Sequence, residues 1–258
     1  MDLTALPAPP VVVDYSTRIP ADGWGMCMNG PDPANPPQIP DGIGDCTFAE
    51  ATHDTLAQSI YAGDVPVTIP NSSLLTGYHA VGGYVLGEPS TDNGCVIQQV
   101  LSYRRKTGLL DSNGNLHKIL AFGQLKNLDN FAMVKTALYI FGSIDIGVNF
   151  PSAAMTQFDE GLPWAPVRGD SIEGGHCVCV QRFDPTVSDG YIKVVTWGQE
   201  QAVRLSWWDA YVEEAWCIIT QDWLSTVSDE TLNGLDLAQL NTDLGQMTNL
   251  GNPLGLSY

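Results

Sequence analysis

The stretch GDCTFAEATHDTLAQSIYAG, residues 44–63, decides the fold. It follows a proline-rich segment, and the change in composition at Gly44 marks the start of regular structure. The residues of one face recur at helical spacing, at Phe48, Thr52, Leu56 and Ile60. This spacing predicts a buried helix of about four turns that ends near Gly63.

The sequence around this helix predicts a helical first half and a β-rich second half. Further helices are expected at 92–107 and 129–142, with a short one at 207–213, whereas 64–92 is rich in turn residues. Strands are expected at 119–125, 143–151, 176–184, 191–198 and 215–220. The order of these elements predicts an α+β fold.

The two ends of the chain differ from its middle. Residues 1–45 contain nine of the 17 prolines, so we expect an extended arm at 1–21 and a proline-rich insertion at 31–43. The domain itself is expected to cover residues 22–223. Residues 224–258 are rich in Leu and Asn, and they predict either a loosely docked tail or a second arm. We expect the arms 1–21 and 224–258 to bind protein neighbours.

Composition excludes several classes of function. The formal net charge is −18, which disfavours binding to nucleic acid and to anionic membranes. The N-terminus has no basic region followed by an apolar run, and no stretch is long enough to span a membrane, so we expect synthesis in the cytoplasm without a signal peptide. The six cysteines include no CxxC pair, so we expect free thiols and no metal or cofactor.

Cys46 is the first candidate for chemistry. It lies at the predicted start of the helix, where the helix dipole and the unpaired N–H groups stabilise a thiolate. Asp45 before it is a residue type that caps helices. The alternative interpretation is a structural cysteine, which is a common buried residue.

His176 is the second candidate. It follows Gly174-Gly175 and opens a predicted strand, where a glycine pair leaves room for a substrate. Because side chains alternate along a strand, His176 faces away from Cys177 and Cys179, which are expected to lie in the core. Cys46 precedes His176 by 130 residues.

These motifs resemble a known family. The segments Gly44–Thr47, Gly174–His176 and Val195–Gly198 are similar to those of papain-like cysteine peptidases, and more narrowly to a compact bacterial and bacteriophage branch. The resemblance covers about residues 22–223 and implies a helical half with a central Cys-bearing helix, an antiparallel β-barrel-like half and a cleft between them. It also implies that Cys46 attacks a carbonyl group while His176 acts as base and then as acid.

The chain departs from the family where an Asn usually orients the histidine. Val195 occupies that position and cannot hold an imidazole. We expect Thr196 to take the role, with Gln199 or a backbone carbonyl as alternatives, while Trp197 shields the histidine from water.

A second departure concerns the donor that stabilises the oxyanion. Position 40, six residues before Cys46, is a proline and offers no hydrogen bond. Asn29 and Gln38 are the candidates to replace it. Loss of one such donor typically costs about 2.7–4 kcal/mol of transition-state stabilisation.

Two functions follow from the resemblance. The first is a cysteine hydrolase, either a peptidase or a peptide amidase, that uses Cys46 and His176 on a protein or peptide substrate, with association with a phage virion as a further expectation. The second is a catalytically degenerate papain-like module that serves as a structural or interaction protein of a phage virion, in its capsid or tail. The departures at Val195 and Pro40 and the two arms point to the second, whereas the placement of Cys46 and His176 points to the first, which is the function we expect.

The other histidines and the basic run of the chain are expected to have structural roles. His53 lies seven residues after Cys46 and is expected in the core or the cleft wall, while His79 and His117 are expected in turns. The basic run 104–106 is expected on the exposed face of a helix.

Overall fold

A computed structural model of the chain describes residues 8–19, 23–24, 42–63, 65–187, 191–220 and 223. The helices are α1 Cys46–Gly63, α2 Asn71–Gly82, the 3-10 turn η1 Pro89–Thr91, α3 Ile97–Lys106, α4 Phe131–Phe141, α5 Ser152–Asp159 and α6 Leu205–Tyr211. The strands are β1 Val13–Asp14, β2 Leu109–Leu110, β3 Leu116–His117, β4 Ile119–Gln124, β5 Ile144–Pro151, β6 Ile172–Phe183, β7 Ile192–Thr196, β8 Gln199–Val203 and β9 Val212–Thr220.

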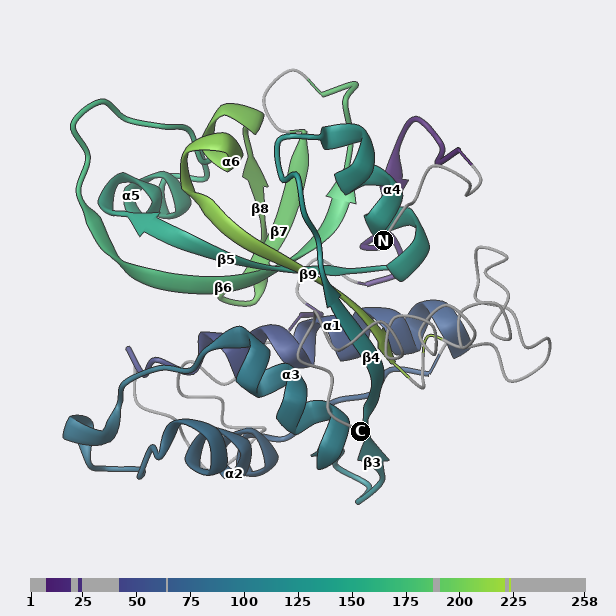
Figure 1. Ribbon diagram of the computed structural model, residues 1–258, viewed down its shortest axis with the longest axis vertical. Coiled ribbons are helices and arrows are strands. Elements are labelled where there is room, and N and C mark those ends of the chain that lie inside the picture. The colour runs from purple at the N-terminus through teal and green to yellow at the C-terminus, as the bar shows by residue number, and fades with distance from the viewer. Residues whose placement is uncertain are drawn as a thin grey trace, which may run out of the picture.

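The second half of the chain forms an antiparallel sheet. Its strands lie in the order β4-β9-β5-β6-β7-β8, and β1 adds to β6 outside this path. Every strand pair in it is antiparallel, and the order ends at β4 and β8, so the sheet is open rather than a closed barrel. The helices α4, α5 and α6 lie on the sheet side of the molecule (Figure 1). The mixed α+β prediction is confirmed.

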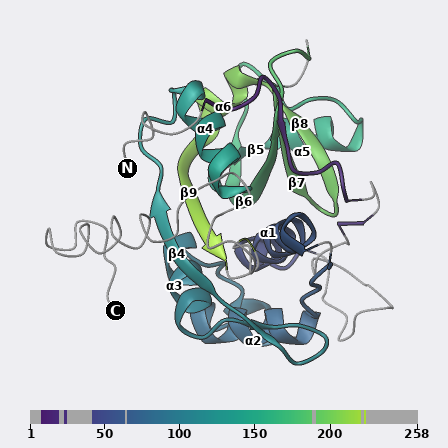
Figure 2. The ribbon, with the colours of Figure 1, turned by 90° about the vertical axis from the view of Figure 1, so that its right-hand side faces the viewer.

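The helix α1 lies between the sheet and the helices α2 and α3, as Figure 2 shows along its axis. All residues from Thr47 to Ser59 are buried, the polar ones included. Phe48 and Ala51 pack with Leu74 and Tyr78 in the core of the helical half, while a separate core lies on the sheet. The sequence therefore correctly predicted a central helix that begins at Cys46.

The helix α2 corrects the sequence prediction, which gave residues 64–92 as turns. This helix has no side-chain cap at Pro70, and it contains two glycines, so its local signals are weak. It is stabilised by packing: a Cβ atom on Gly77 would lie 2.4 Å from Cε1 of Phe48, so only glycine permits this approach to α1. His79 consequently lies in a helix and not in a turn.

No helix within the described residues is both long and apolar enough to cross a membrane.

Candidate active site

A cleft of about 940 Å³ lies where the helical half meets the sheet. Its described lining comes from the start of α1, from the segment that leads into α3, and from the strands β5, β6 and β9. Cys46 and His176 both line it. The structure thus brings together two residues that lie 130 positions apart in the chain.

Cys46 is the first residue of α1. The backbone oxygen of Asp45 accepts hydrogen bonds from Phe48 and Ala49, which fixes the helix start. The backbone N–H groups of Cys177 and Thr47 point to the thiol sulfur. Because Cys177 directly follows His176, the thiol lies against the strand that carries the histidine.

The carboxylate of Asp45 does not cap the helix, contrary to the sequence prediction. Both its oxygens are buried and find no hydrogen-bond partner within the described part of the chain. Burial raises the pKa of Asp45 well above its ordinary value, and the charge of Asp92 adds to this. Burial likewise raises the pKa of the Cys46 thiol to about 11, opposed by the N–H of Cys177 and reinforced by Asp45.

His176 is positioned by three side chains. Its Nε2 atom lies 2.9 Å from Oγ1 of Thr196, and Thr196 itself is buried. Trp197 stacks on the imidazole with a ring-centroid distance of 5.0 Å and an interplanar angle of 15°. Phe150 contacts the ring edge-on at 5.3 Å. The ring therefore has a defined plane and a defined Nε2 partner.

Thr196 and Trp197 owe their places to a tight turn between β7 and β8. Thr196 pairs with Gln199, which leaves only Trp197 and Gly198 in the turn, and both have positive φ angles, of 45° and 73°. A two-residue hairpin of this kind requires positive φ at both central residues, which is rare for a bulky side chain. The turn thereby directs both residues to His176.

Burial lowers the pKa of His176 to about 4. Together with the raised pKa of Cys46, this favours a neutral thiol and a neutral imidazole near pH 7. Thr196 carries no charge, so it orients the ring without stabilising an imidazolium ion.

The other predicted residues take different places. Val195 is buried and packs with Cys179, so it does not contact the imidazole, whereas Gln199 is exposed at the end of the turn. His53 is buried, and its ring meets Trp24 edge-on at 5.9 Å. Asn29 and Gln38, the predicted oxyanion donors, lie outside the described residues, as do residues 31–41 of the insertion and the whole segment 224–258.

Asp92 is a residue that sequence reasoning missed. Both its carboxylate oxygens accept a hydrogen bond from the N–H of Gly44, at 3.0 Å each, and Oδ1 also accepts one from the hydroxyl of Tyr78 at 2.5 Å. The N–H of Gly94 donates to the same hydroxyl at 2.9 Å. Asp92 thus ties one wall of the cleft to the turn that precedes Cys46.

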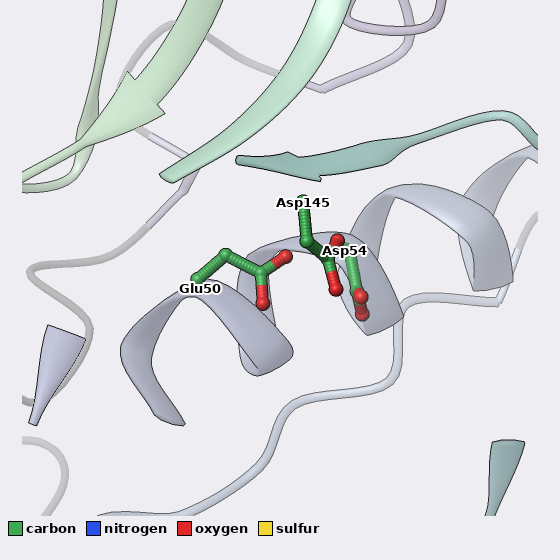
Figure 3. A group of neighbouring side chains, drawn as sticks. All are labelled: Glu50, Asp54 and Asp145. Atoms are coloured by element: carbon green, nitrogen blue, oxygen red, sulfur yellow. The ribbon is translucent and has the colours of Figure 1, made fainter. Parts of the chain in front are cut away.

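A buried cluster of ionisable side chains joins α1 to β5, and Figure 3 shows its three carboxylates, Glu50, Asp54 and Asp145. Glu50 and Asp54 come from α1, Asp145 comes from β5, and Arg104 reaches them from α3. Arg104 donates two hydrogen bonds to Asp54, at 2.8 and 2.9 Å, and lies 3.9 Å from Asp145. This corrects the prediction that residues 104–106 are a solvated run, because Arg104 is buried against a partner 50 residues away.

Oxygens of the three carboxylates lie within 4.8 Å of one another, which is a spacing that a cation could bridge. Arg104 already supplies a positive charge there, however. Burial raises the pKa of Asp145 to about 7 and that of Glu50 well above its ordinary value, so both hold a proton more tightly than an exposed carboxyl group does. We therefore interpret the cluster as an ion-pair network that joins α1, α3 and β5.

Solved structures share this architecture. Xylellain, a cysteine protease from Xylella fastidiosa, superimposes with a TM-score of 0.59 over 82% of this chain and 87% of its own, at 14% identity. The Carica candamarcensis cysteine protease CMS1MS2 gives 0.55 over 81% and 98%, at 12% identity. The procathepsin B of Trypanosoma congolense gives 0.57 over 86% and 81%, also at 12%.

The chain has a papain-like fold. No protein family and no curated protein matches the sequence. At these identities the likeness establishes the papain-like architecture, while the chemistry has to be argued from the residues of the cleft.

Proposed function

We propose that this papain-like chain is a cysteine hydrolase that cleaves peptide or amide bonds, with Cys46 as nucleophile and His176 as base. One observation carries the proposal. The thiol at the start of α1 lies against the N–H of Cys177, and the residue before Cys177 is a histidine whose ring is held by Thr196. Both residues line one cleft that is large enough for an extended peptide.

The geometry gives each ring nitrogen of His176 a different role. Because Nε2 of His176 faces Thr196, Nδ1 is the atom left to accept the thiol proton. As both groups are neutral, this transfer accompanies attack by Sγ of Cys46 on the carbonyl carbon. The N–H groups at the start of α1 stabilise the oxyanion, with Asn29 or Gln38 as the predicted side-chain donor.

The remaining steps complete the hydrolysis. The C–N bond breaks, the leaving amine takes the proton from Nδ1 of His176, and an acyl thioester on Cys46 remains. A water molecule then loses a proton to His176 and attacks the thioester. Cleavage of the C–S bond releases the carboxylic acid and returns the proton to the thiolate.

The proposal is tested with the full chain by mapping cleavage of a pool of random decapeptides by mass spectrometry. We expect cleavage by the wild type and none by Cys46→Ala, with His176→Ala reduced about 10²-fold or more. His117→Ala, on the β2–β3 hairpin, is the matched control and is expected to cleave like the wild type.

A second measurement follows the thiol without a substrate. Iodoacetamide labelling of Cys46 between pH 6 and 9 should slow in His176→Ala, because the neutral imidazole no longer accepts the thiol proton. No cleavage by the wild type, combined with labelling that is insensitive to His176→Ala, would overturn the proposal.

The raised pKa of Cys46 and the lowered pKa of His176 favour a second candidate, a papain-like module that no longer hydrolyses its ligand. A structural or interaction role in a phage virion is the form of it that the sequence resemblance implies. Co-purification of the full chain with assembled phage particles would support that role, and its absence from them would remove it.

A further inference from the structure

The cleft that holds Cys46 and His176 is lined by four carboxylates. They come from different walls: Asp92 from the segment before α3, Glu173 from β6, and Glu213 and Glu214 from β9. The described lining includes no Lys or Arg. The acidic residues do not form a site by themselves. They line the cleft for which a substrate has already been argued.

A β-bulge explains why two consecutive glutamates line the same cleft. Side chains normally alternate between the two faces of a strand. In the pairing of β9 with β5, Gly147 lies opposite Glu214 and Val148 lies opposite Val212, so Glu213 is an extra residue. A bulge of this kind redirects a side chain, and here both glutamates reach the cleft.

Each of these two carboxylates is held by a neutral donor. Nε1 of Trp216 donates to Glu214 at 2.6 Å, and Nδ2 of Asn149 donates to Glu213 at 2.7 Å. Neither glutamate has an ion-pair partner in the described part of the chain. Their negative charges are therefore oriented but not neutralised.

Gly147 provides the space for Glu214. A Cβ atom at position 147 would lie 2.8 Å from Cγ and 3.0 Å from Oε1 of Glu214. The glutamate thus lies across the backbone of β5, at a position where any larger residue would displace it. Glu214 is half-buried and Glu213 is exposed, so the pair offers one sheltered and one accessible carboxylate.

We propose that Glu213 and Glu214 are specificity-determining residues that select peptides with a Lys or Arg side chain. A cation between the two carboxylates restores charge balance in a cleft whose described lining has no Lys or Arg, whereas an acidic side chain is repelled. The net charge of −18 draws cationic peptides toward the molecule as well. This inference rests on the proposed hydrolase function and names its substrate class.

The test uses two peptidyl chloromethyl ketones that are identical except for a Lys or a norleucine side chain, which have similar length but different charge. Alkylation of Cys46 in the full chain is followed by mass spectrometry, and each rate is divided by the iodoacetamide rate of the same variant. We expect a Lys-to-norleucine ratio of about ten or more in the wild type. The ratio should fall toward one in the double variant Glu213→Gln/Glu214→Gln and in 1 M salt.

Glu160→Gln is the matched control, because it removes an exposed carboxylate next to α5 that does not line the cleft. It should keep the wild-type ratio. A wild-type ratio near one, with His176-dependent iodoacetamide labelling intact, would overturn the specificity inference and leave the hydrolase proposal standing.

A binding measurement tests the specificity inference even where the hydrolase proposal fails. If Cys46 shows no enhanced reactivity, the affinities of fluorescent Lys and norleucine peptides for Cys46→Ala still test the charge of the cleft. Equal affinities would overturn the inference, and tighter binding of the Lys peptide that is lost in the double glutamine variant would support it.

Discussion

The Nε2 atom of His176 lies 2.9 Å from the Oγ1 atom of Thr196. This contact gives the imidazole a neutral partner at a position next to the one where papain-like peptidases usually place an asparagine. Because the partner is a hydroxyl, it fixes the ring plane and leaves the charge state of the ring to its surroundings.

Thr196→Val tests that contact. The substitution keeps the shape of a buried side chain and removes the hydroxyl, so the ring loses its Nε2 partner. We expect kcat to fall about 10–100-fold with little change in KM, as for other residues that orient a reacting group. Thr196→Ser restores the hydroxyl and should recover most of kcat. An unchanged kcat in Thr196→Val would remove Thr196 from the mechanism.

Asp92 should matter for the cleft wall as well as for the thiol. Asp92→Ala removes the acceptor for the N–H of Gly44 and for the hydroxyl of Tyr78. We therefore expect the free energy of unfolding to fall by about 1–3 kcal/mol. The rate of Cys46 labelling should fall too, because the turn before the helix loosens. Asp92→Asn keeps an acceptor oxygen and should recover most of both.

Chemical denaturation and iodoacetamide labelling measure the two effects of Asp92 separately. Glu88→Ala is the control, since Glu88 is an exposed carboxylate on the same connecting segment. Equal behaviour of the Ala variants at positions 88 and 92 would show that Asp92 has no positioning role.

Arg104→Met should be strongly destabilising. It leaves Asp54 buried without its bidentate partner, and breaking a buried pair in this way typically costs about 3–5 kcal/mol. Lys106→Ala, at the exposed end of the same helix, should change the free energy of unfolding by less than about 0.5 kcal/mol. The double variant Arg104→Met/Asp54→Leu removes both charges and should recover a large part of the loss. Urea unfolding of the wild type, Arg104→Met, Asp54→Leu and the double variant forms the cycle.

The stability that Asp145 and Glu50 contribute should decrease as the pH rises from about 4 to about 7, while the lowered pKa of His176 makes a contribution of opposite sign. The folded-state pKa of Asp145 is raised to about 7, and that of Glu50 is raised as well, so both groups bind protons more tightly when the chain is folded. Their contribution is complete below the pKa of the unfolded chain and is lost as the pH passes the folded-state values, with a slope of at most about 1.4 kcal/mol per pH unit for each proton.

Denaturant titrations at several pH values measure this slope. Asp145→Asn cannot ionise and should flatten the decrease, whereas Asp129→Asn, an exposed carboxylate, should not. Equal slopes in the wild type and in Asp145→Asn would contradict the assignment.

The sequence was sufficient where the signals are local. The start of α1 at Cys46 follows from the change in composition at Gly44, and the strands β5, β6, β7 and β9 follow from runs of apolar residues bounded by turns. Thr196 was singled out from the motif Val195–Gly198, although the strand expected at 191–198 ends at Thr196 and the turn at Trp197 and Gly198 was not predicted.

The sequence was insufficient where a long-range partner decides the outcome. Three adjacent basic residues at 104–106 look solvated, and only the tertiary structure places Asp54 against the first of them. The helix α2 lacks a cap and depends on the contact of Gly77 with Phe48. The bulge at Glu213 depends on the register between β9 and β5, which no local pattern specifies.

The position of the thiol is set partly by charges at a distance from it. Cys46, Glu50 and Asp54 are spaced four residues apart on α1, which places Asp54 about 12 Å along the axis from the thiol. Arg104 of α3 donates two hydrogen bonds to Asp54 of α1. The helix α1 therefore cannot slide or rotate by one residue without separating this buried ion pair. The ion pair therefore fixes the position of α1 along its axis, and with it the depth at which Cys46 lies in the cleft.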